Sequence, residues 1–559
     1  MDQENPATVA DYYADFLSEK ETPAVYQLSG GMIAFLADAI YRKGKTPLIT
    51  NRHEQASGFA AEGGTRVTGN TCVALGTSGP GASNLVTAIA SCYFDSVPVL
   101  FITGQVNTNE IKSLAGQRQN GFQELDVVSM VKGITKATFS PKNATEAVEA
   151  IHRAWEIANQ ARFGPVLIDL PIDIQQLTLG NTKTSRLKTT HEFEFILSDD
   201  VFSQVNLAIQ KSKQPLILAG GGIRLDCATA DLSSFARETQ IPVVSTLMGL
   251  DSSTEIGDLN LGFIGSYGNR WANEALRNSD LLIVLGCRLD IRQTGSSIES
   301  FKKGKTIIRV DIDDFELSGR VNADIKVKST IHQFLSDPRL SRVRRDSTSI
   351  VEATQLKRIS NPQVAEQEFA LSLNPNDFLG RISQIHKDAD GYIVDVGQHQ
   401  MWAAQSIELQ PKQRFLTSGG LGAMGFSLPA SIGAAITNEN KWVVILGDGC
   451  AQLAAPELQT ISELDLPVVI YVMNNGQHGM VAQFQDENMQ SRYVGTRIGY
   501  STPDFCELAK TYGFMRTFTF STGDQYSELE QALSQGAKGP ILVNVLISKD
   551  AKALPKMKS

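Results

Sequence analysis

The sequence predicts an α/β protein with three doubly wound domains, each built on a parallel sheet. Short apolar runs rich in Val and Ile alternate with helix-like segments through most of the chain. Many of these runs end in Gly, Asp, Asn or Arg, and open α/β sheets bind their ligands at such strand ends. The chain of 559 residues has room for roughly three or four domains of about 150 residues each.

The composition favours an enzyme that acts on small molecules. Hydrophobic residues make up 42% and charged residues 20% of the chain, as in ordinary globular proteins. The net charge of −9 argues against nucleic acid or an anionic membrane as a partner. The first residues lack the order of a signal peptide, and no apolar run has transmembrane length, so we expect a cytoplasmic protein. The six cysteines lack metal-ligand spacing, so we expect buried free thiols.

Residues 1–185 form the first predicted domain. Glu54 falls in the first turn of a predicted helix, where by itself a carboxylate would only stabilise the helix dipole. The loop Gly76–Gly81 opens a further helix. It could present backbone N–H groups to an anion or to a ring, or it could be a tight turn capped at Ser83. A polar linker is expected at residues 186–197.

Residues 198–340 form the second predicted domain, in which four strand-like runs each end in Gly, Asp or Arg. Its glycine-rich turn, Gly220–Gly222, is common in α/β domains, so spacing alone leaves nucleotide binding an even choice. The charged stretch 338–366 is expected to be a second linker that runs over the surface.

Residues 367–559 form the third predicted domain. Two apolar runs, Trp442–Leu446 and Val468–Met473, flank one predicted helix near Pro456, which makes a βαβ unit. The basic C-terminal tail is expected to be a solvated end. The first and third domains share the same alternation of predicted strands and helices, which would suit two related halves of one site.

Polar residues follow both strands of this βαβ unit. Gly447-Asp448-Gly449 comes after the first strand and Asn474-Asn475 after the second. The Asp448 carboxylate, the Asn475 amide oxygen and a backbone carbonyl just beyond would suit Mg²⁺ holding a diphosphate. Glycines there let the backbone approach phosphate oxygens. Alone, either dipeptide is more simply explained as a strand end rich in turn formers.

Taken together, the longer motifs resemble a known family. Gly-Asp-Gly, residues 450–473 and then Asn-Asn resemble the signature of thiamine diphosphate enzymes. The runs HEQASGFAAEG, TSGPGASNLVTAIA, DSVPVLFITGQV, VGQHQMWAAQ, TSGGLGAMGF and NNGQHGMVAQFQ resemble the catalytic subunit of acetohydroxyacid (acetolactate) synthases, in order, over nearly the whole chain. The resemblance implies pyrimidine-binding, central flavin-binding and diphosphate-binding domains. It also implies a homodimer or tetramer with sites between subunits, and it allows a separate regulatory subunit.

The resemblance implies three cofactors: thiamine diphosphate, Mg²⁺ and a structural FAD. Glu54 would activate the pyrimidine ring, Met424 would bend the cofactor, and Asp448, Asn475 and the Gln477 carbonyl would hold Mg²⁺. Further candidates for a mainly apolar catalytic pocket are Phe122, Gln123, Gln398, His399 and Met480. His399 could equally be only a structural hydrogen-bonding residue.

The resemblance also implies a wider set of binding residues. For thiamine diphosphate they are Gly79, Pro80, Asn84, Gly397, Gln398, Gly422, Met424, Gly447, Asp448, Gly449, Cys450, Asn475, Gln477, His478 and Gly479. For FAD, the segments GCRLDIRQTG, TLMG, VDIDD and the glycine turn supply Gly221, Gly222, Thr246, Leu247, Met248, Gly286, Arg288, Asp290, Arg292, Asp311 and Asp313.

The implied reaction is a two-carbon transfer of the transketolase type, as in branched-chain amino acid biosynthesis. Pyruvate would lose CO₂ and its two-carbon unit would join a second 2-keto acid, giving a 2-acetohydroxyacid. Two departures concern the acceptor: the family's MVRQW is MVAQF here, ending in Phe484, and GQRQNG adds Arg118. A keto-sugar or aldehyde acceptor is therefore the alternative. A non-catalytic member and a pyruvate oxidase are further alternatives, the first opposed by intact Glu54, Asp448 and Asn475.

Overall fold

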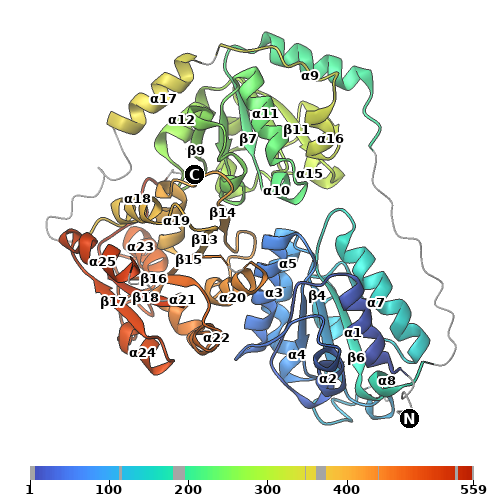
Figure 1. Ribbon diagram of the computed structural model, residues 1–559. Coiled ribbons are helices and arrows are strands. Elements are labelled where there is room, and N and C mark those ends of the chain that lie inside the picture. The colour runs from blue at the N-terminus through green and yellow to red at the C-terminus, as the bar shows by residue number, and fades with distance from the viewer. Residues whose placement is uncertain are drawn as a thin grey trace.

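The computed structural model describes residues 7–112, 116–179, 195–346, 348–360, 373–438, 440–534 and 539–556. Within them the chain forms three six-stranded parallel sheets flanked by helices, coloured blue to cyan, green to yellow and orange to red in Figure 1. This confirms the predicted fold class. Most of the linker expected at 186–197 lies outside the described residues.

The first sheet is formed by short buried strands with helices between them. Its strands are β1 (Val25–Gln27), β2 (Leu48–Thr50), β3 (Val73–Gly76), β4 (Leu100–Gln105), β5 (Ala137–Phe139) and β6 (Val166–Pro171). Its helices are α1 (Val9–Glu19), α2 (Ala34–Lys43), α3 (Glu54–Thr68), α4 (Pro80–Asn84), α5 (Val86–Asp95), α6 (Val127–Val131), α7 (Ala144–Asn159) and α8 (Ile172–Gln176).

The central sheet follows the same alternation. Its strands are β7 (Pro215–Ala219), β8 (Val243–Ser245), β9 (Asn260–Phe263), β10 (Leu281–Leu285), β11 (Thr306–Asp311) and β12 (Ile325–Lys328). Its helices are α9 (Asp199–Lys211), α10 (Gly222–Leu225), α11 (Thr229–Thr239), α12 (Arg270–Asn278), α13 (Ile291–Thr294), α14 (Ile298–Lys302), α15 (Asp314–Ser318), α16 (Ile331–Ser336) and α17 (Thr348–Ser360). Helix α17 lies inside the stretch expected to be a linker, and its Ile350 and Val351 pack on the central core, so that expectation is corrected there.

The third sheet contains the βαβ unit singled out by the sequence. Its strands are β13 (Gly391–Val394), β14 (Arg414–Leu416), β15 (Trp442–Gly447), β16 (Val468–Asn474), β17 (Arg516–Phe520) and β18 (Ile541–Leu546). Its helices are α18 (Pro375–Ile385), α19 (Gln398–Ser406), α20 (Ser427–Thr437), α21 (Asp448–Leu453), α22 (Glu457–Glu463), α23 (Gly479–Asn488), α24 (Phe505–Thr511) and α25 (Tyr526–Ser534). The helix expected near Pro456 is α22, with Pro456 at its N-cap, and a further short helix, α21, precedes it between the same two strands.

The strand orders relate the three sheets. The first sheet runs β2-β1-β3-β4-β6-β5 and the third runs β14-β13-β15-β16-β18-β17. When the strands of each sheet are numbered from one, both orders read 2-1-3-4-6-5. This agrees with the shared alternation of strands and helices in the two domains. The central sheet runs β12-β11-β10-β7-β8-β9, the order of dinucleotide-binding folds.

The first and third sheets share one hydrophobic core because helices α3 and α20 cross at very short range. A Cβ on Gly63 would lie 2.2 Å from the Ala430 carbonyl oxygen, and one on Gly433 would lie 1.9 Å from the Ala60 carbonyl oxygen. The crossing therefore requires glycine at both positions.

Two sequence expectations about the chain as a whole can be compared with the described residues. All six cysteines are free; five are buried, as expected, whereas Cys227 is exposed. Among the helices that the structure describes, none has both the length and the apolar character needed to cross a membrane.

Candidate functional site

The candidate site begins at the carboxyl edge of the third sheet. Strands β13, β15 and β16 are neighbours, and Asp395, Asp448 and Asn475 follow them directly. The chain passes from β13 outward to β14 and returns to β15, so the sheet changes direction between β13 and β15. Ligands of doubly wound sheets bind at such a point. The structure thus brings the predicted segments Gly397–His399, Gly447–Cys450 and Asn475–Gly479 to one edge.

Asp448 is the buried carboxylate of this edge, 2% exposed. Its Oδ1 accepts hydrogen bonds from the Gly449 N–H at 2.7 Å and the Tyr500 hydroxyl at 3.0 Å, and its Oδ2 accepts from the Gln477 N–H at 3.3 Å. Burial raises the pKa of Asp448, which means that its negative charge is not fully compensated. A bound cation would stabilise that charge.

Amide side chains continue the site from Asn475. The Asn475 Nδ2 donates to Gln398 Oε1 at 3.1 Å, which leaves the Asn475 amide oxygen as its acceptor atom. Gln398 Nε2 in turn donates to Gln483 Oε1 and to the Ala551 carbonyl, both at 3.1 Å. The Asn475 amide oxygen, the Asp448 carboxylate and the adjacent Gln477 backbone carbonyl form the hard oxygen donor set that suits Mg²⁺.

His399 lies in a cradle made by two glycines. A Cβ on Gly397 would come within 2.7 Å of the His399 ring, and one on Gly447 within 3.0 Å. Burial lowers the pKa of His399 to about 4, so the ring is neutral at pH 7. Its Nε2 is buried without a hydrogen-bond partner among the described residues. Such an atom fits a ligand's phosphate group better than a purely structural role.

Met424 reaches this edge from the loop that precedes α20. A Cβ on Gly449 would lie 2.8 Å from the His478 ring and 3.2 Å from Met424 Cε. Gly422 in the same loop has φ of +72°, a conformation suited to glycine. Met480 and Gly479 begin helix α23, where Met480 is half-buried. The predicted residues of the third domain therefore form one connected group.

The C-terminal segment 548–556 covers this group, so the expected solvated end is corrected at its buried residues, whereas Lys549, Asp550 and Lys556 are exposed. Ala551 and Ala553 are 1% and 0% exposed. Gln477 Nε2 donates to the Lys549 carbonyl at 2.6 Å, and Gln483 Nε2 donates to the Ala553 carbonyl at 3.1 Å. Glutamine side chains at the site thus replace water as partners of the tail backbone.

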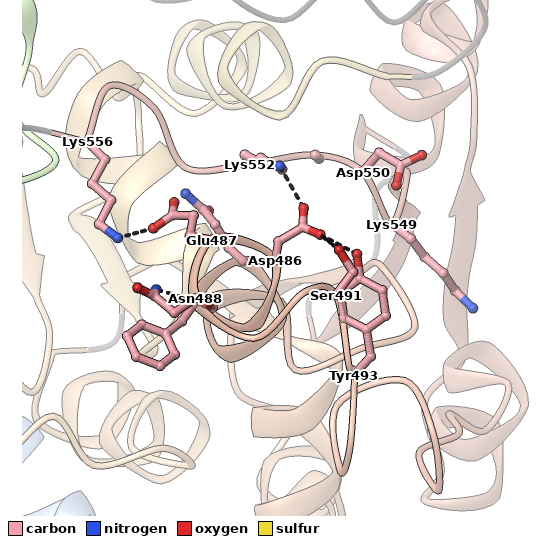
Figure 2. Close-up of polar contacts among 12 residues, drawn as sticks. Asp486, Glu487, Asn488, Ser491, Tyr493, Lys549, Asp550, Lys552 and Lys556 are labelled. Carbon is pink, nitrogen blue, oxygen red and sulfur yellow. Dashed lines mark hydrogen bonds and ion pairs between the residues drawn. The ribbon is translucent and has the colours of Figure 1, made fainter.

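Ion pairs add to the attachment of this segment (Figure 2). Lys552 Nζ lies 2.8 Å from Asp486 Oδ2 on helix α23, and Lys556 pairs with the neighbouring Glu487. The hydrogen bond from Lys552, with others from Ser491 and Tyr493, holds the pKa of Asp486 well below its usual range. Two of the tail's lysines are therefore paired with acidic side chains, while Lys549 and Asp550 remain exposed.

The predicted residues of the first domain form a second group. Glu54 is the first residue of α3 and is 6% exposed. Its Oε2 accepts from Asn84 Nδ2 at 2.9 Å, and a Cβ on Gly81 would lie 3.2 Å from its Oε1. A Cβ on Gly79 would lie 2.8 Å from the Gln123 carbonyl oxygen. The segment Gly79–Asn84 thus meets the buried Glu54 carboxylate, and Gln123 packs against Gly79 of the same segment.

The two groups belong to neighbouring domains. Asn51 Nδ2 donates to Glu457 Oε2 at 2.9 Å and the Arg52 N–H to Glu457 Oε1 at 2.8 Å, which ties the start of α3 to α22. Among the described residues of this single chain, no hydrogen bond joins Glu54 to Asp448. Phe122, 80% exposed, and Phe484, 48% exposed, both face solvent in the single chain, as does Arg118.

A separate cavity of about 570 Å³ lies where the three domains meet. It includes the direction change of the central sheet between β7 and β10, where a Cβ on Gly220 would lie 2.2 Å from the Gly286 carbonyl oxygen. Seven of the residues predicted to bind FAD line it: Gly221, Gly222, Thr246, Met248, Gly286, Arg288 and Asp311. Five arginines also line it, Arg66, Arg162, Arg224, Arg288 and Arg414, together with five acidic residues, Asp95, Asp226, Asp251, Asp311 and Glu316. Arginines are suited to a diphosphate and acidic side chains to the hydroxyl groups of a dinucleotide.

The other residues predicted for FAD lie outside this lining. Asp290 caps helix α13 by accepting from two of its N–H groups, and Asp313 caps α15 and pairs with Arg162 at 3.1 Å. Leu247 packs on the core of the third domain, and Arg292 is exposed. Inside the cavity, burial raises the pKa of Asp311 to about 6.

Sequence reasoning missed several residues of the site. Asp395 follows a strand end as Asp448 does, so the same signal could have indicated it. Tyr500, Arg497 and Gln483 carry no such signal, since they come from α23 and the loop beyond it. Arg497 Nε donates to Gln477 Oε1 at 2.5 Å, which secures the residue proposed to supply a carbonyl ligand.

Comparisons with known proteins match the chain in three parts. Residues 7–130 match the thiamine pyrophosphate enzyme N-terminal TPP binding domain, residues 203–337 the central domain and residues 395–545 the C-terminal TPP binding domain of the same enzymes. A probable acetolactate synthase large subunit from Methanocaldococcus jannaschii is 35% identical, over 95% of this chain and 90% of that protein. Acetolactate synthase large subunits from Cyanidium caldarium and Lactococcus lactis are 33% and 32% identical, over 97% and 99% of this chain and 93% and 94% of those proteins.

Proposed function

The chain belongs to the acetolactate synthase large subunit family of thiamine pyrophosphate (thiamine diphosphate) enzymes, and from this premise we propose that it joins two 2-keto acids with loss of CO₂. Pyruvate is the donor, a second 2-keto acid the acceptor, and a 2-acetohydroxyacid the product. The observation that carries the proposal is that one thiamine-binding domain holds a buried Glu54 bonded to Asn84 and the other a buried Asp448 bonded to Gln477. The names of the relatives favour this acceptor over a keto-sugar.

When bound, thiamine diphosphate supplies the nucleophilic carbon and the electron sink that decarboxylation of a 2-keto acid needs. The chain's residues hold and orient it. Asp448, the Asn475 amide oxygen and the Gln477 carbonyl would hold Mg²⁺, and His399 Nε2 would contact the diphosphate. Met424 would press against the cofactor between its two rings. Glu54 would hold a proton at the pyrimidine ring, with Asn84 fixing its carboxylate.

Residues next to the proposed active site would exclude water and shape the region where the acceptor binds. Gln123 and Phe122 of the first domain, with Met480 and Phe484 of α23, supply the apolar and amide surface. A dry site favours loss of a carboxylate as CO₂, because the charge is no longer stabilised by water. By resemblance to the family, we assign the complete site to two chains of a homodimer, with Glu54 from one chain and Asp448 from the other. The relatives' description as large subunits supports a separate regulatory subunit.

FAD would occupy the cavity between the three domains. Arg288 would bind its diphosphate and Asp311 its hydroxyl groups, both from strand ends that line the cavity. The flavin is structural in this proposal, because no electron leaves the substrates in the reaction. A pyruvate oxidase would instead reduce the flavin at the rate of turnover, and anaerobic spectra with pyruvate distinguish the two enzymes.

The test is to mix purified protein with thiamine diphosphate, Mg²⁺, FAD and pyruvate, and to follow CO₂ and acetolactate together. One acetolactate for each CO₂ is expected. The matched variant Glu54→Gln keeps the size and the bond with Asn84 but cannot exchange a proton, so turnover should nearly vanish. Equal activity of Glu54→Gln and wild type would sink the assigned role of Glu54. CO₂ without acetolactate would overturn the acceptor assignment.

A further inference from the structure

We propose that Asp95 and Asp395 are positioning residues that hold the Met424 loop, defined as Thr417–Phe426, from two different domains. The loop connects β14 to α20 and carries both Gly422 and Met424. The catalytic consequence of this arrangement rests on the proposed function. That the two aspartates hold the loop rests only on the loop's own contacts.

Asp95 holds the beginning of the loop from the first domain. It ends helix α5, and its side chain is 1% exposed. Its Oδ2 accepts from the Gly419 N–H at 3.0 Å and its Oδ1 from the Gly420 N–H at 2.7 Å. A Cβ on Gly420 would lie 2.7 Å from Phe94 Cβ, so the loop backbone is pressed against the end of α5.

Asp395 holds the end of the loop from the third domain. It is 0% exposed and follows strand β13. Its Oδ1 accepts from the Gly425 N–H at 3.0 Å, and its Oδ2 accepts from the N–H and the hydroxyl of Ser427, both at 2.8 Å. Met424 therefore stands between two carboxylates that each take hydrogen bonds from neighbouring parts of the backbone.

These contacts determine where Met424 lies. Hydrogen bonds from a backbone N–H to a carboxylate are shorter and stronger than neutral ones. Loss of the acceptor would leave buried N–H groups without partners, which the loop could relieve only by moving. Gly422 and Gly425 have φ of +72° and +82°, so the loop has little intrinsic preference for this shape. The two aspartates supply that preference.

Asp95 also links the loop to the helix that carries Glu54. Arg66 of α3 donates to the Thr417 carbonyl at 2.8 Å and lies 3.8 Å from Asp95 Oδ2. Ser91 of α5 is bonded to Ser418 at 3.4 Å. Movement of the first domain against the third would therefore be transmitted to Met424 through one group of side chains.

The test compares Asp95→Asn with Asp169→Asn. Asp169 is an equally buried carboxyl of the first domain, 4% exposed, that accepts from Thr103 and Gln105 and does not contact the loop. Hydrogen–deuterium exchange of the protein without cofactors is measured by mass spectrometry over residues 417–427. Asp95→Asn should speed exchange there by roughly tenfold or more, as expected for loss of one charge-assisted hydrogen bond. Asp169→Asn should leave it unchanged.

The cofactor-dependent consequence has its own measurements. In Asp95→Asn, deuterium exchange at the thiazolium carbon of bound thiamine diphosphate and kcat should both fall by roughly tenfold, while KM for pyruvate stays constant. Should Asp95→Asn fail to fold, Asp95→Ser removes the same carboxylate with less volume. Unchanged loop exchange, or equal effects in Asp169→Asn, would overturn the positioning role. Failure of the wild type to form acetolactate would overturn the proposed function alone, because loop exchange needs no turnover.

Discussion

Gln483→Ala should release the C-terminal segment 548–556 from the site. Gln483 is 4% exposed, donates to the Ala553 carbonyl at 3.1 Å, and accepts from the Ala553 N–H at 3.0 Å and from Gln398 at 3.1 Å. Two of these hydrogen bonds hold the segment, and at about 1 kcal/mol each they make about 2 kcal/mol. Since about 1.4 kcal/mol is a factor of ten, the ratio of attached to detached segment should fall roughly thirtyfold.

Limited trypsin digestion measures this ratio, because Lys549, Lys552 and Lys556 lie in the segment. Removal of the C-terminal peptide should be much faster in Gln483→Ala than in wild type. Gln485→Ala is the matched control: Gln485 lies on the same helix and is 7% exposed, but it bonds Val494 and Thr496 instead. Equal cleavage rates in the two variants would refute the idea that Gln483 attaches the segment.

Four further changes have defined outcomes. Asp448→Asn should raise the Mg²⁺ concentration for half-maximal activity at least roughly tenfold; an unchanged titration would contradict its role as ligand. Burial raises the pKa of Glu62 from 4.5 to about 7, so the native state binds the proton more tightly and loses stability as pH rises between these values. Glu62→Gln should flatten that decline in thermal midpoints. Gly433→Ala should lower the midpoint by several degrees, since its Cβ would strike α3, whereas Gly31→Ala meets no atom within 4 Å. Phe484→Trp should sharpen preference for 2-ketobutyrate as acceptor; an unchanged product ratio would count against the keto-acid assignment.

Much of the fold followed from local patterns. Runs such as Trp442–Leu446 and Val468–Met473 are buried strands because a parallel sheet covered on both faces needs continuous apolar residues. Asp448 and Asn475 come together because parallel strands end at the same edge. Glu54, Asn84 and Gln123 were named from the resemblance; in the structure Asn84 bonds the Glu54 carboxylate, and Gln123 packs against the nearby Gly79.

The site also contains features without a local signal. A tail rich in lysine has the composition of a solvated end, yet Ala551 and Ala553 are buried, because Gln398 donates to its backbone and Gln483 both donates and accepts. The arginines of the central cavity come from all three domains. Nothing in the neighbourhood of any one of them in the chain indicates that they meet.

The sequence by itself determined the three parallel sheets and the polar residues at the strand ends. Those features depend on side-chain periodicity and on the few residues directly after each strand, which are local properties of the chain. The residues proposed to hold a thiamine cofactor came instead from the resemblance of longer motifs to a known family. Only the tertiary structure decided the burial of the tail, the hold of Asp95 on the Gly419–Gly420 backbone and the glycine contact between α3 and α20. These depend on hydrogen bonds and packing between residues 70 to more than 300 positions apart, whose energies leave no trace in the local pattern.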